Sequence, residues 1–314
     1  MLWIVIAIFS YFLSAVVAVL DKFLLSGRIA SAAMYAFLMA MFSTFAVVFI
    51  PFGVEWYGRY PVGLAIVSGF LFLYALVAFY AAAKRSEIAK VAPLVGVVVA
   101  LASFAITAEM KLYQGIPIGM SPEIALSFAL LVGGAFLISF DLPLRKTDRV
   151  PFLGVVSGIL FAVSIVFLKV SIVEMNFVNG YFWSRAGMFL AGFSLLLVPL
   201  YRREIFAASS DFSRPHPQHT LTGFLFVTNK VSGGVAAFLL AYAVSLGPLA
   251  FVHALNGVQF AFVFLLSLVL SFFFPKVYGE KLALNDWIQK AAALILIMLG
   301  IWILSISGGV SVLL

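Results

Sequence analysis

The sequence contains no cysteine, few charged residues and no long polar stretch. Without cysteine, disulfides and thiolate metal sites are both excluded. Charged residues make up 10% of the chain and hydrophobic residues 65%, whereas about a quarter of the residues of a soluble globular protein are charged. The longest polar connection, 201–219, is too short to form a domain. We therefore expect no soluble enzyme module.

Acidic residues and histidines are too few and too dispersed for most chemistry. All twelve aspartates and glutamates fall in connections or at the ends of apolar segments. Of the three histidines, His216 and His219 share one Pro-containing connection, which we interpret as a solvated loop, and His253 stands alone. A metal site needs several suitable ligands, and an integral membrane enzyme needs clustered histidines, paired acids or an activated serine. The sequence predicts no metal, no cofactor and no catalytic residues.

Ten long apolar runs follow one another along the chain. A membrane-spanning helix needs about 20 predominantly apolar residues, and such a run must be helical because lipid offers no hydrogen-bond partner to the backbone. The sequence therefore predicts an all-α membrane protein with ten transmembrane helices. The predicted segments are 2–20, 32–53, 61–83, 90–108, 122–140, 150–172, 177–200, 220–246, 248–274 and 287–307.

The hydrophobic pattern runs twice, through 1–141 and again through 150–314, with 142–149 as a cytoplasmic linker. Each half has five segments, and an odd number leaves the second copy inverted relative to the first, an arrangement found in many secondary transporters. We predict two inverted five-helix repeats. The aligned positions are Lys22 with Lys169, Tyr35 with Tyr181, Pro51 with Pro199, Ser68–Phe72 with Thr222–Phe226, and Gly134–Ser139 with Gly300–Ser305.

The net charge of +7 is interpreted as a topology signal, and we expect no nucleic acid partner. The connections after the odd-numbered segments hold fourteen Lys and Arg residues, and those after the even-numbered segments hold three. Basic connections stay in the cytoplasm, so both termini are predicted outside. The short loops favour the cytoplasmic membrane of a prokaryote.

The second half carries the most recognisable pattern: an acidic–basic pair, a short amphipathic approach and a glycine-containing last helix. On these features the chain resembles the drug/metabolite transporter superfamily, in particular its EamA-like ten-helix branch. The resemblance spans nearly the whole chain and implies ten helices that transport small metabolites. It also implies cytoplasmic termini, opposite to the loop charge. The residues concerned are Gly279–Leu282, Trp287–Gln289, Leu294–Ser305, Tyr181–Phe193 with Arg185, Ala81–Leu94 with Pro93, and Glu109 with Lys111 as the first-half pair.

Two cations are predicted inside the membrane. Arg185 lies roughly 12 Å from the outer end of its segment and Lys230 roughly 15 Å from the inner end of its own, at 1.5 Å rise per residue. Both depths are near the middle of a hydrocarbon core of about 30 Å. A buried cation is costly unless it is paired, and we expect no carboxylate at that depth. An anionic or zwitterionic substrate would supply the charge; alternatively, the side chains bond helix-end carbonyls or snorkel to an interface.

Other polar residues complete the predicted site. His253 could carry protons or serve as a hydrogen-bonded packing residue. Lys22 and Lys169 occupy repeat-equivalent positions and could anchor the helices at the interface or gate each mouth of the cavity. The predicted substrate-binding residues are Arg185, Asn229, Lys230, Asn256, Gln259, Tyr181 and Trp183.

These features favour a secondary transporter of a small anionic or zwitterionic metabolite, such as an amino acid or organic acid, working by alternating access around a midplane cavity. The alternatives are an integral membrane enzyme and a lipid-handling protein without vectorial transport. A second fold, of the bile-acid-symporter type, would break its helices at Pro93 and Pro117. The sequence leaves open the cargo, the flux direction, the coupling ion and the oligomeric state, a homodimer included.

Overall fold

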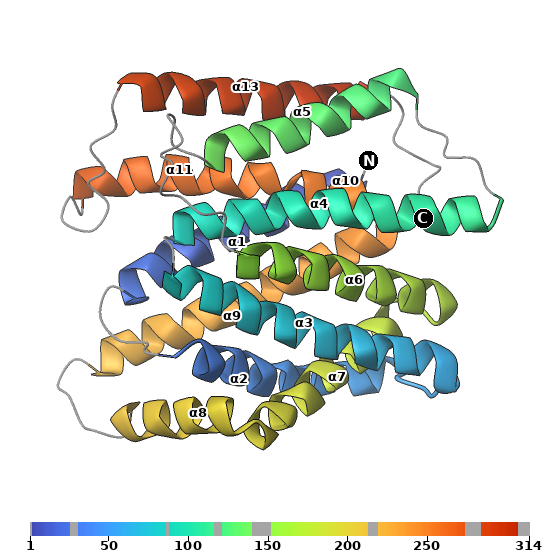
Figure 1. Cartoon of the computed structure of the whole chain (residues 1–314), viewed down its shortest axis with the longest axis vertical. Helices are drawn as coiled ribbons and strands as arrows, with labels where there is room; N and C mark the ends of the chain where they lie inside the picture. The colour runs from blue at the N-terminus through green and yellow to red at the C-terminus, as the bar shows by residue number, and fades with distance from the viewer. Residues whose placement is uncertain are drawn as a thin grey trace. The chain divides into compact units, whose positions relative to one another are not determined.

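The computed structural model describes residues 2–25, 31–85, 88–115, 121–139, 152–212, 219–273 and 284–306, and every regular element in these ranges is a helix (Figure 1). The chain divides into two compact units, each built from segments of both sequence halves. We call them the α1 unit and the α7 unit after one helix of each, and each is described by itself.

The described helices include eight spans long and apolar enough to cross a membrane, two of which combine consecutive helices (α2 with η1, and α10 with α11). The number rises to nine if α7 (Phe177–Leu197) and α8 (Pro199–Phe212), which meet at a bend of 96°, form a single broken span. The apolar stretch Pro122–Leu137 is also helical but shorter. This is the pattern of a multi-pass helical membrane protein.

The connection predicted at 201–219 differs from the structure, because α8 continues as helix to Phe212. Pro199 explains why α8 is separate from α7. Proline disfavours the helical conformation in the residue before it, and Val198 is extended, with φ −85° and ψ 115°. The sequence is therefore helical on both sides of a one-residue break.

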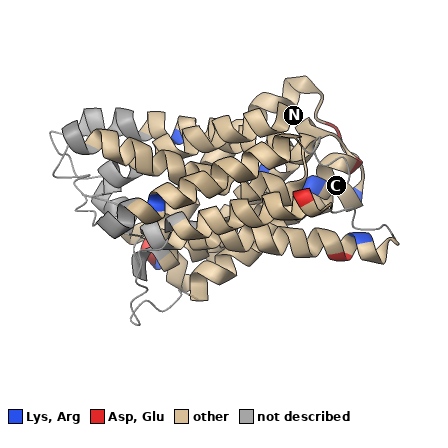
Figure 2. Ribbon diagram, turned by 90° about the horizontal axis from the view of Figure 1, so that it is seen from above, with Lys and Arg blue, Asp and Glu red and all other residues tan. Residues whose placement is uncertain are grey.

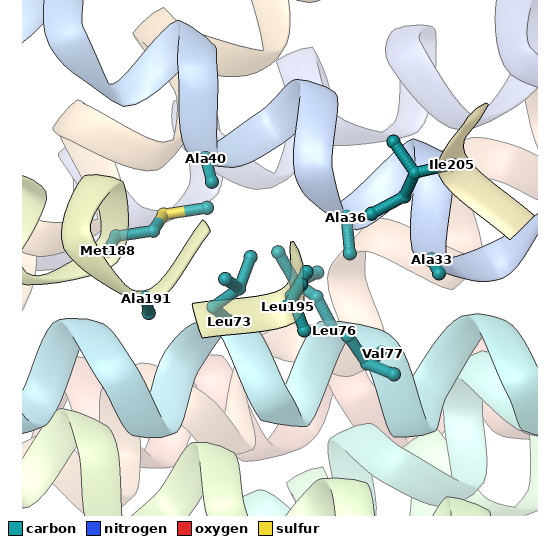
Figure 3. Close-up of a cluster of buried hydrophobic side chains, with 10 residues drawn as sticks. All are labelled: Ala33, Ala36, Ala40, Leu73, Leu76, Val77, Met188, Ala191, Leu195 and Ile205. Atoms are coloured by element: carbon teal, nitrogen blue, oxygen red, sulfur yellow. The ribbon is translucent and has the colours of Figure 1, made fainter. Parts of the chain in front are cut away.

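The α7 unit is built around α3. A buried apolar cluster joins α2, α3, α7 and α8 (Figure 3). It contains Ala33, Ala36, Ala40, Leu73, Leu76, Val77, Met188, Ala191, Leu195 and Ile205. The helices of this unit are α2 (Ala32–Phe42), the 3-10 helix η1 (Ser43–Phe52), α3 (Arg59–Arg85), α4 (Ile88–Tyr113, up to Met110), α6 (Phe152–Glu174), α7 and α8.

Glycines permit the closest helix crossing in this unit. A Cβ on Gly69 of α3 would collide with the Ser184 carbonyl oxygen of α7, and a Cβ on Gly187 of α7 would collide with the Ile66 carbonyl oxygen of α3. Small residues of this kind let helix backbones approach directly, which is how membrane helices gain packing in the absence of a hydrophobic driving force.

The α1 unit is joined by buried hydrogen bonds from side chains to helix carbonyls. Ser10 Oγ donates to Ala236 O at 2.8 Å, and Tyr11 Oη donates to Val252 O at 2.9 Å. Ser127 Oγ in turn donates to Gly300 O at 2.8 Å. The helices of this unit are α1 (Leu2–Leu25), α5 (Pro122–Ser139), α9 (His219–Leu246), α10 (Leu249–Ala254), α11 (Asn256–Phe273) and α13 (Leu284–Ile306).

Within the α1 unit, α5 and α13 pack antiparallel and reciprocally. A Cβ on Gly134 would lie 2.7 Å from Ile297, and a Cβ on Gly300 would lie 2.9 Å from Leu131. Each of these contact residues precedes the glycine of its own helix by three positions. Moving from Gly134 back to Leu131 on α5 therefore corresponds to moving from Ile297 forward to Gly300 on α13, so the two helices run in opposite directions. An approximate two-fold rotation exchanges the two contacts.

Within the α7 unit, α2 and α7 also run antiparallel. Ser43, at the end of α2, donates its hydroxyl to the carbonyl of Arg185, early in α7, at 3.1 Å. Ala40, one turn earlier in α2, contacts Gly192, two turns later in α7. At the start of α2, the Ser31 hydroxyl donates to a Glu204 carboxylate oxygen of α8 at 2.7 Å.

Helix α4 is continuous from Ile88 to Tyr113 and passes through Pro93 without a break. The bile-acid-symporter type of fold predicted a broken helix at this proline, so its continuity argues against that alternative. Pro117, the second predicted break, lies outside the described residues.

Candidate functional site

The predicted site residues divide between the two units. Tyr181, Trp183 and Arg185 lie on α7 and Lys169 on α6, all in the α7 unit. Lys22 lies in α1, but its side chain is outside the described part. Charged residues are sparse along the described helices (Figure 2). The α1 unit holds Asn229 and Lys230 on α9, His253 on α10, and Asn256 and Gln259 on α11.

Arg185 projects from α7 into an aromatic setting. Its Cζ lies 4.7 Å from the ring centroid of Tyr181, one turn earlier on α7, and 5.2 Å from that of Phe72 on α3. Nη1 donates a weak hydrogen bond to Met188 Sδ at 3.6 Å. Cation–π contacts contribute about 0.5–2 kcal/mol each, more when desolvated. The side chain is therefore held between two helices mainly by ring faces.

The Nε–H of this guanidinium is buried and has no hydrogen-bond partner in the described part of the chain. A buried donor left unsatisfied costs about 1–3 kcal/mol, and more when it is charged. Arg185 also has no ion-pair partner among the described residues. The aromatic contacts orient the charge without neutralising it.

The described carboxylates do not enter the core. Glu204 is half-buried and accepts the Ser31 hydrogen bond, while the other described glutamate side chains are exposed. The exposed ones are Glu55, Glu109, Glu123 and Glu174. This placement agrees with the expectation that acids stay at segment ends, within the residues that the structure describes.

The aromatic contacts around Arg185 continue in both directions. Tyr181 meets Phe49 of η1 edge-on at 5.6 Å, and Phe72 meets Phe161 of α6 edge-on at 5.0 Å. Tyr181 belongs to the predicted site, whereas Phe72, Phe49 and Phe161 do not. The chain has 34 phenylalanines, and no signal in a single sequence distinguishes these three from the rest.

A hydroxyl cluster includes Ser184, the residue before Arg185 on α7. Ser68 of α3 is 3.3 Å from Ser184 of α7 and 3.4 Å from Ser164 of α6, measured between Oγ atoms. Ser164 also donates to the Ser68 carbonyl at 2.8 Å. All three serines are buried. The cluster joins α3, α6 and α7, and its serines are not among the predicted site residues.

Trp183 is directed towards a loop rather than towards Arg185. Its Nε1–H donates to the Glu55 carbonyl at 3.1 Å, and its ring meets Trp56 edge-on at 5.4 Å. The segment Val54–Tyr57, which we call the strap, crosses the start of α7 between Gly53 and Gly58. These glycines have φ of 87° and 102°, values that favour glycine.

Asn179 fastens the strap to α7. This fully buried residue accepts a hydrogen bond from the Glu55 backbone N–H at 2.7 Å and donates from Nδ2 to the Gly53 carbonyl at 3.2 Å. Asn176 caps α7 by accepting the Asn179 backbone N–H at 2.9 Å and donates from Nδ2 to the Tyr57 hydroxyl at 3.1 Å. The first turn of α7 and the strap thus form one hydrogen-bonded structure.

The predicted residues of the α1 unit lie on α9, α10 and α11. Asn229 and Lys230 are buried, and Asn256 and Gln259 are half-buried. His253 is buried, and among the described residues its Nε2 has no hydrogen-bond partner. In the described part of the chain, no group of three His, Asp or Glu residues could hold a metal ion.

Comparison with known proteins supports the fold alone. No protein-family model and no curated protein matches the chain. A solved structure described only as "Crystal structure of protein" is similar over 96% of this chain and 97% of its own, with a TM-score of 0.65 and 14% sequence identity. Over almost its whole length, this membrane protein therefore shares its fold with a protein of unstated function.

Proposed function

We propose that this protein is a secondary transporter that moves a small anionic or zwitterionic organic metabolite by alternating access. Its ten helices would form two inverted five-helix repeats, in the manner of the EamA-like branch of the drug/metabolite transporter superfamily. The observation that carries this proposal is the antiparallel packing of helices that occupy the same place in the two sequence halves.

The pair α5 and α13 provides the clearest support. They are the fifth and tenth predicted segments, and Gly134 and Gly300 are aligned in the repeat. Equivalent helices of a direct repeat lie parallel, whereas those of an inverted repeat lie antiparallel. Here Gly134 packs on Ile297 and Gly300 on Leu131, as a local two-fold axis requires. The second and seventh segments, α2 and α7, are also antiparallel.

Hydrogen bonds from corresponding serines to corresponding helices give further support. In the α1 unit, Ser10 of α1 donates to Ala236 O of α9 at 2.8 Å, and in the α7 unit, Ser157 of α6 donates to Ala75 O of α3 at 2.9 Å. Ser10 and Ser157 each lie twelve residues before a repeat-aligned lysine. In each case the first helix of one half is hydrogen-bonded to the third helix of the other half. This pairing is expected when two repeats exchange helices.

The charge of the cargo is inferred from Arg185. A guanidinium on a membrane helix, without an ion-pair partner among the described residues, favours a ligand that brings negative charge. The same electrostatics would repel a purely cationic cargo. Lys230 and the polar residues of α9–α11 stay in the proposed substrate-binding set, and His253 stays a candidate for proton coupling. The proposed setting is the cytoplasmic membrane of a prokaryote.

The test is counterflow in sealed proteoliposomes. Vesicles are preloaded with unlabelled amino acids, organic acids or phosphorylated sugars, and a labelled compound of the same class is added outside. We expect the label to accumulate for one class of anion or zwitterion. Accumulation should be absent in liposomes without the protein and should disappear after permeabilisation with a pore-forming peptide. Turnover of a compound by detergent-solubilised protein, or lipid movement without solute uptake, would instead favour the membrane enzyme or the lipid-handling protein.

A further inference from the structure

We propose that Arg185 is a carboxylate-binding subsite, specific for a monocarboxylate on a small, largely apolar body and engaged through the Nε–H and Nη–H edge of the guanidinium. The inference rests on the proposed transport function and narrows its substrate class. Its basis is the geometry around one side chain: two neighbouring rings, one sulfur contact and one buried donor that has no acceptor among the described residues.

The contacts of the guanidinium show which of its hydrogen-bonding groups already have a partner. Tyr181 and Phe72 interact through their ring faces, which offer no hydrogen-bond acceptor oxygen, and Met188 Sδ is only a weak acceptor of one Nη–H. Nε–H is unpaired among the described residues. A carboxylate presents two coplanar acceptors at the spacing of the guanidinium fork. It would satisfy Nε–H and a neighbouring Nη–H together.

The number of charges favours one carboxylate over a phosphate. Arg185 brings a single positive charge to its aromatic surroundings, and the only other described cation on α6 or α7 is Lys169 of α6. Phe161, the α6 residue that contacts Phe72, lies eight positions before Lys169, which is about 12 Å along a helix. A dianion at Arg185 would therefore keep an uncompensated charge in an apolar region, which is strongly unfavourable. A monocarboxylate leaves none.

The apolar surroundings define the rest of the ligand. Within the α7 unit, Phe72, Phe161, Tyr181 and Met188 form the neighbourhood of the guanidinium. A ligand body at this position gains by burying apolar surface, while each unpaired polar group that it buries weakens binding. We infer a carboxylate attached to an aliphatic or aromatic group.

Ligand-induced thermal stabilisation of the full-length protein in detergent tests this directly. Sodium benzoate and sodium butyrate should raise Tm by roughly 3 °C at saturating concentration. Benzamide, butyramide and inorganic phosphate should each raise it by less than a third as much. This comparison uses only the wild-type protein, so it does not depend on any variant folding. Equal stabilisation by acid and amide, or by benzoate and phosphate, would overturn the proposal.

Two variants then assign the effect to Arg185. Arg185→Lys keeps the charge but removes the planar fork, so benzoate should bind at least tenfold more weakly; Arg185→Gln should abolish the Tm shift. The matched control is Arg203→Gln, which removes an exposed arginine of α8 and should respond to benzoate as the wild type does. An unchanged benzoate response in Arg185→Lys contradicts the subsite.

Failure of the subsite and failure of the transport proposal give different results. Counterflow of a solute that persists unchanged in Arg185→Gln, without any acid-specific stabilisation, would reject the carboxylate subsite and retain the transporter. Arg185-dependent stabilisation by benzoate without accumulation in sealed vesicles would retain the subsite and reject transport.

Discussion

At the scale of single residues, glycine and serine shape the crossing of α3 and α7 that carries Arg185. Gly69 and Gly187 allow the backbones of α3 and α7 to touch, and Ser184, beside this crossing, joins the buried hydroxyl cluster. The crossing also positions Arg185, which lies between Ser184 and Gly187 on α7. Small residues thus bring α3 and α7 together, and the rings of Tyr181 and Phe72 hold the guanidinium there.

Gly69→Ala tests this crossing. The new Cβ would overlap the Ser184 carbonyl oxygen and the Met188 amide nitrogen, both backbone atoms that cannot rotate away. We expect the free energy of unfolding to fall by about 1–3 kcal/mol, the usual range for overpacking. The loss is measured as a lower Tm or a lower unfolding midpoint in detergent.

Gly63→Ala on the same helix is the matched control, because no atom lies within 4 Å of its Cβ position. Alanine has the higher helix propensity, so this variant should be neutral or slightly more stable than the wild type. Equal destabilisation of the two variants would show that glycine is needed along α3 for a reason other than this contact.

At the scale of elements, the sequence predicts the helices well and their partners poorly. Apolar runs of about 20 residues predict the helices because lipid allows few other backbone structures. Phe72 was missed since its ring contact with Arg185 depends on the rotation of α3 against α7. The strap was missed as well, although its two glycines are visible, because its bonds to Asn179 join residues more than 120 positions apart.

Asn179→Ala tests the strap as an element. The change removes the fully buried amide that bonds both the Glu55 N–H and the Gly53 carbonyl, so both groups lose their partner. Removing one partner costs about 1–3 kcal/mol per unsatisfied group, so we expect a lower Tm and faster proteolysis between Gly53 and Gly58. Limited digestion with mass-spectrometric mapping of the cleavage sites measures the second effect.

Glu55→Gln serves as the control for this change. The strap uses the backbone N–H and carbonyl of Glu55, whereas its side chain is exposed. Surface substitutions of this kind stay within about 0.5 kcal/mol of the wild type. A protease-resistant strap in Asn179→Ala would mean that Trp183 and Asn176 hold it without Asn179.

At the scale of the whole molecule, two expectations about orientation conflict. The excess of Lys and Arg in the connections after odd-numbered segments predicts both termini outside, whereas the resemblance to EamA-like transporters implies termini in the cytoplasm. The inverted repeat sets a further condition, which holds whichever side of the membrane the termini occupy. The connection after the second segment and the connection after the seventh must face opposite sides of the membrane.

The absence of cysteine makes both questions accessible to single-cysteine labelling. Glu55→Cys reports on the strap after the second segment, and Arg203→Cys reports on α8 after the seventh; both wild-type side chains are exposed. With a membrane-impermeant maleimide applied to intact cells, we expect Glu55→Cys to react and Arg203→Cys to react only after lysis. Glu174→Cys, after the sixth segment, should behave as Glu55→Cys does, because both connections follow even-numbered segments.

Labelling with all sides exchanged would keep the inverted repeat and favour cytoplasmic termini, since the fold is unchanged when the whole molecule is turned over. Labelling of Glu55→Cys and Arg203→Cys from the same side would contradict the inversion itself, and with it the proposed alternating-access mechanism.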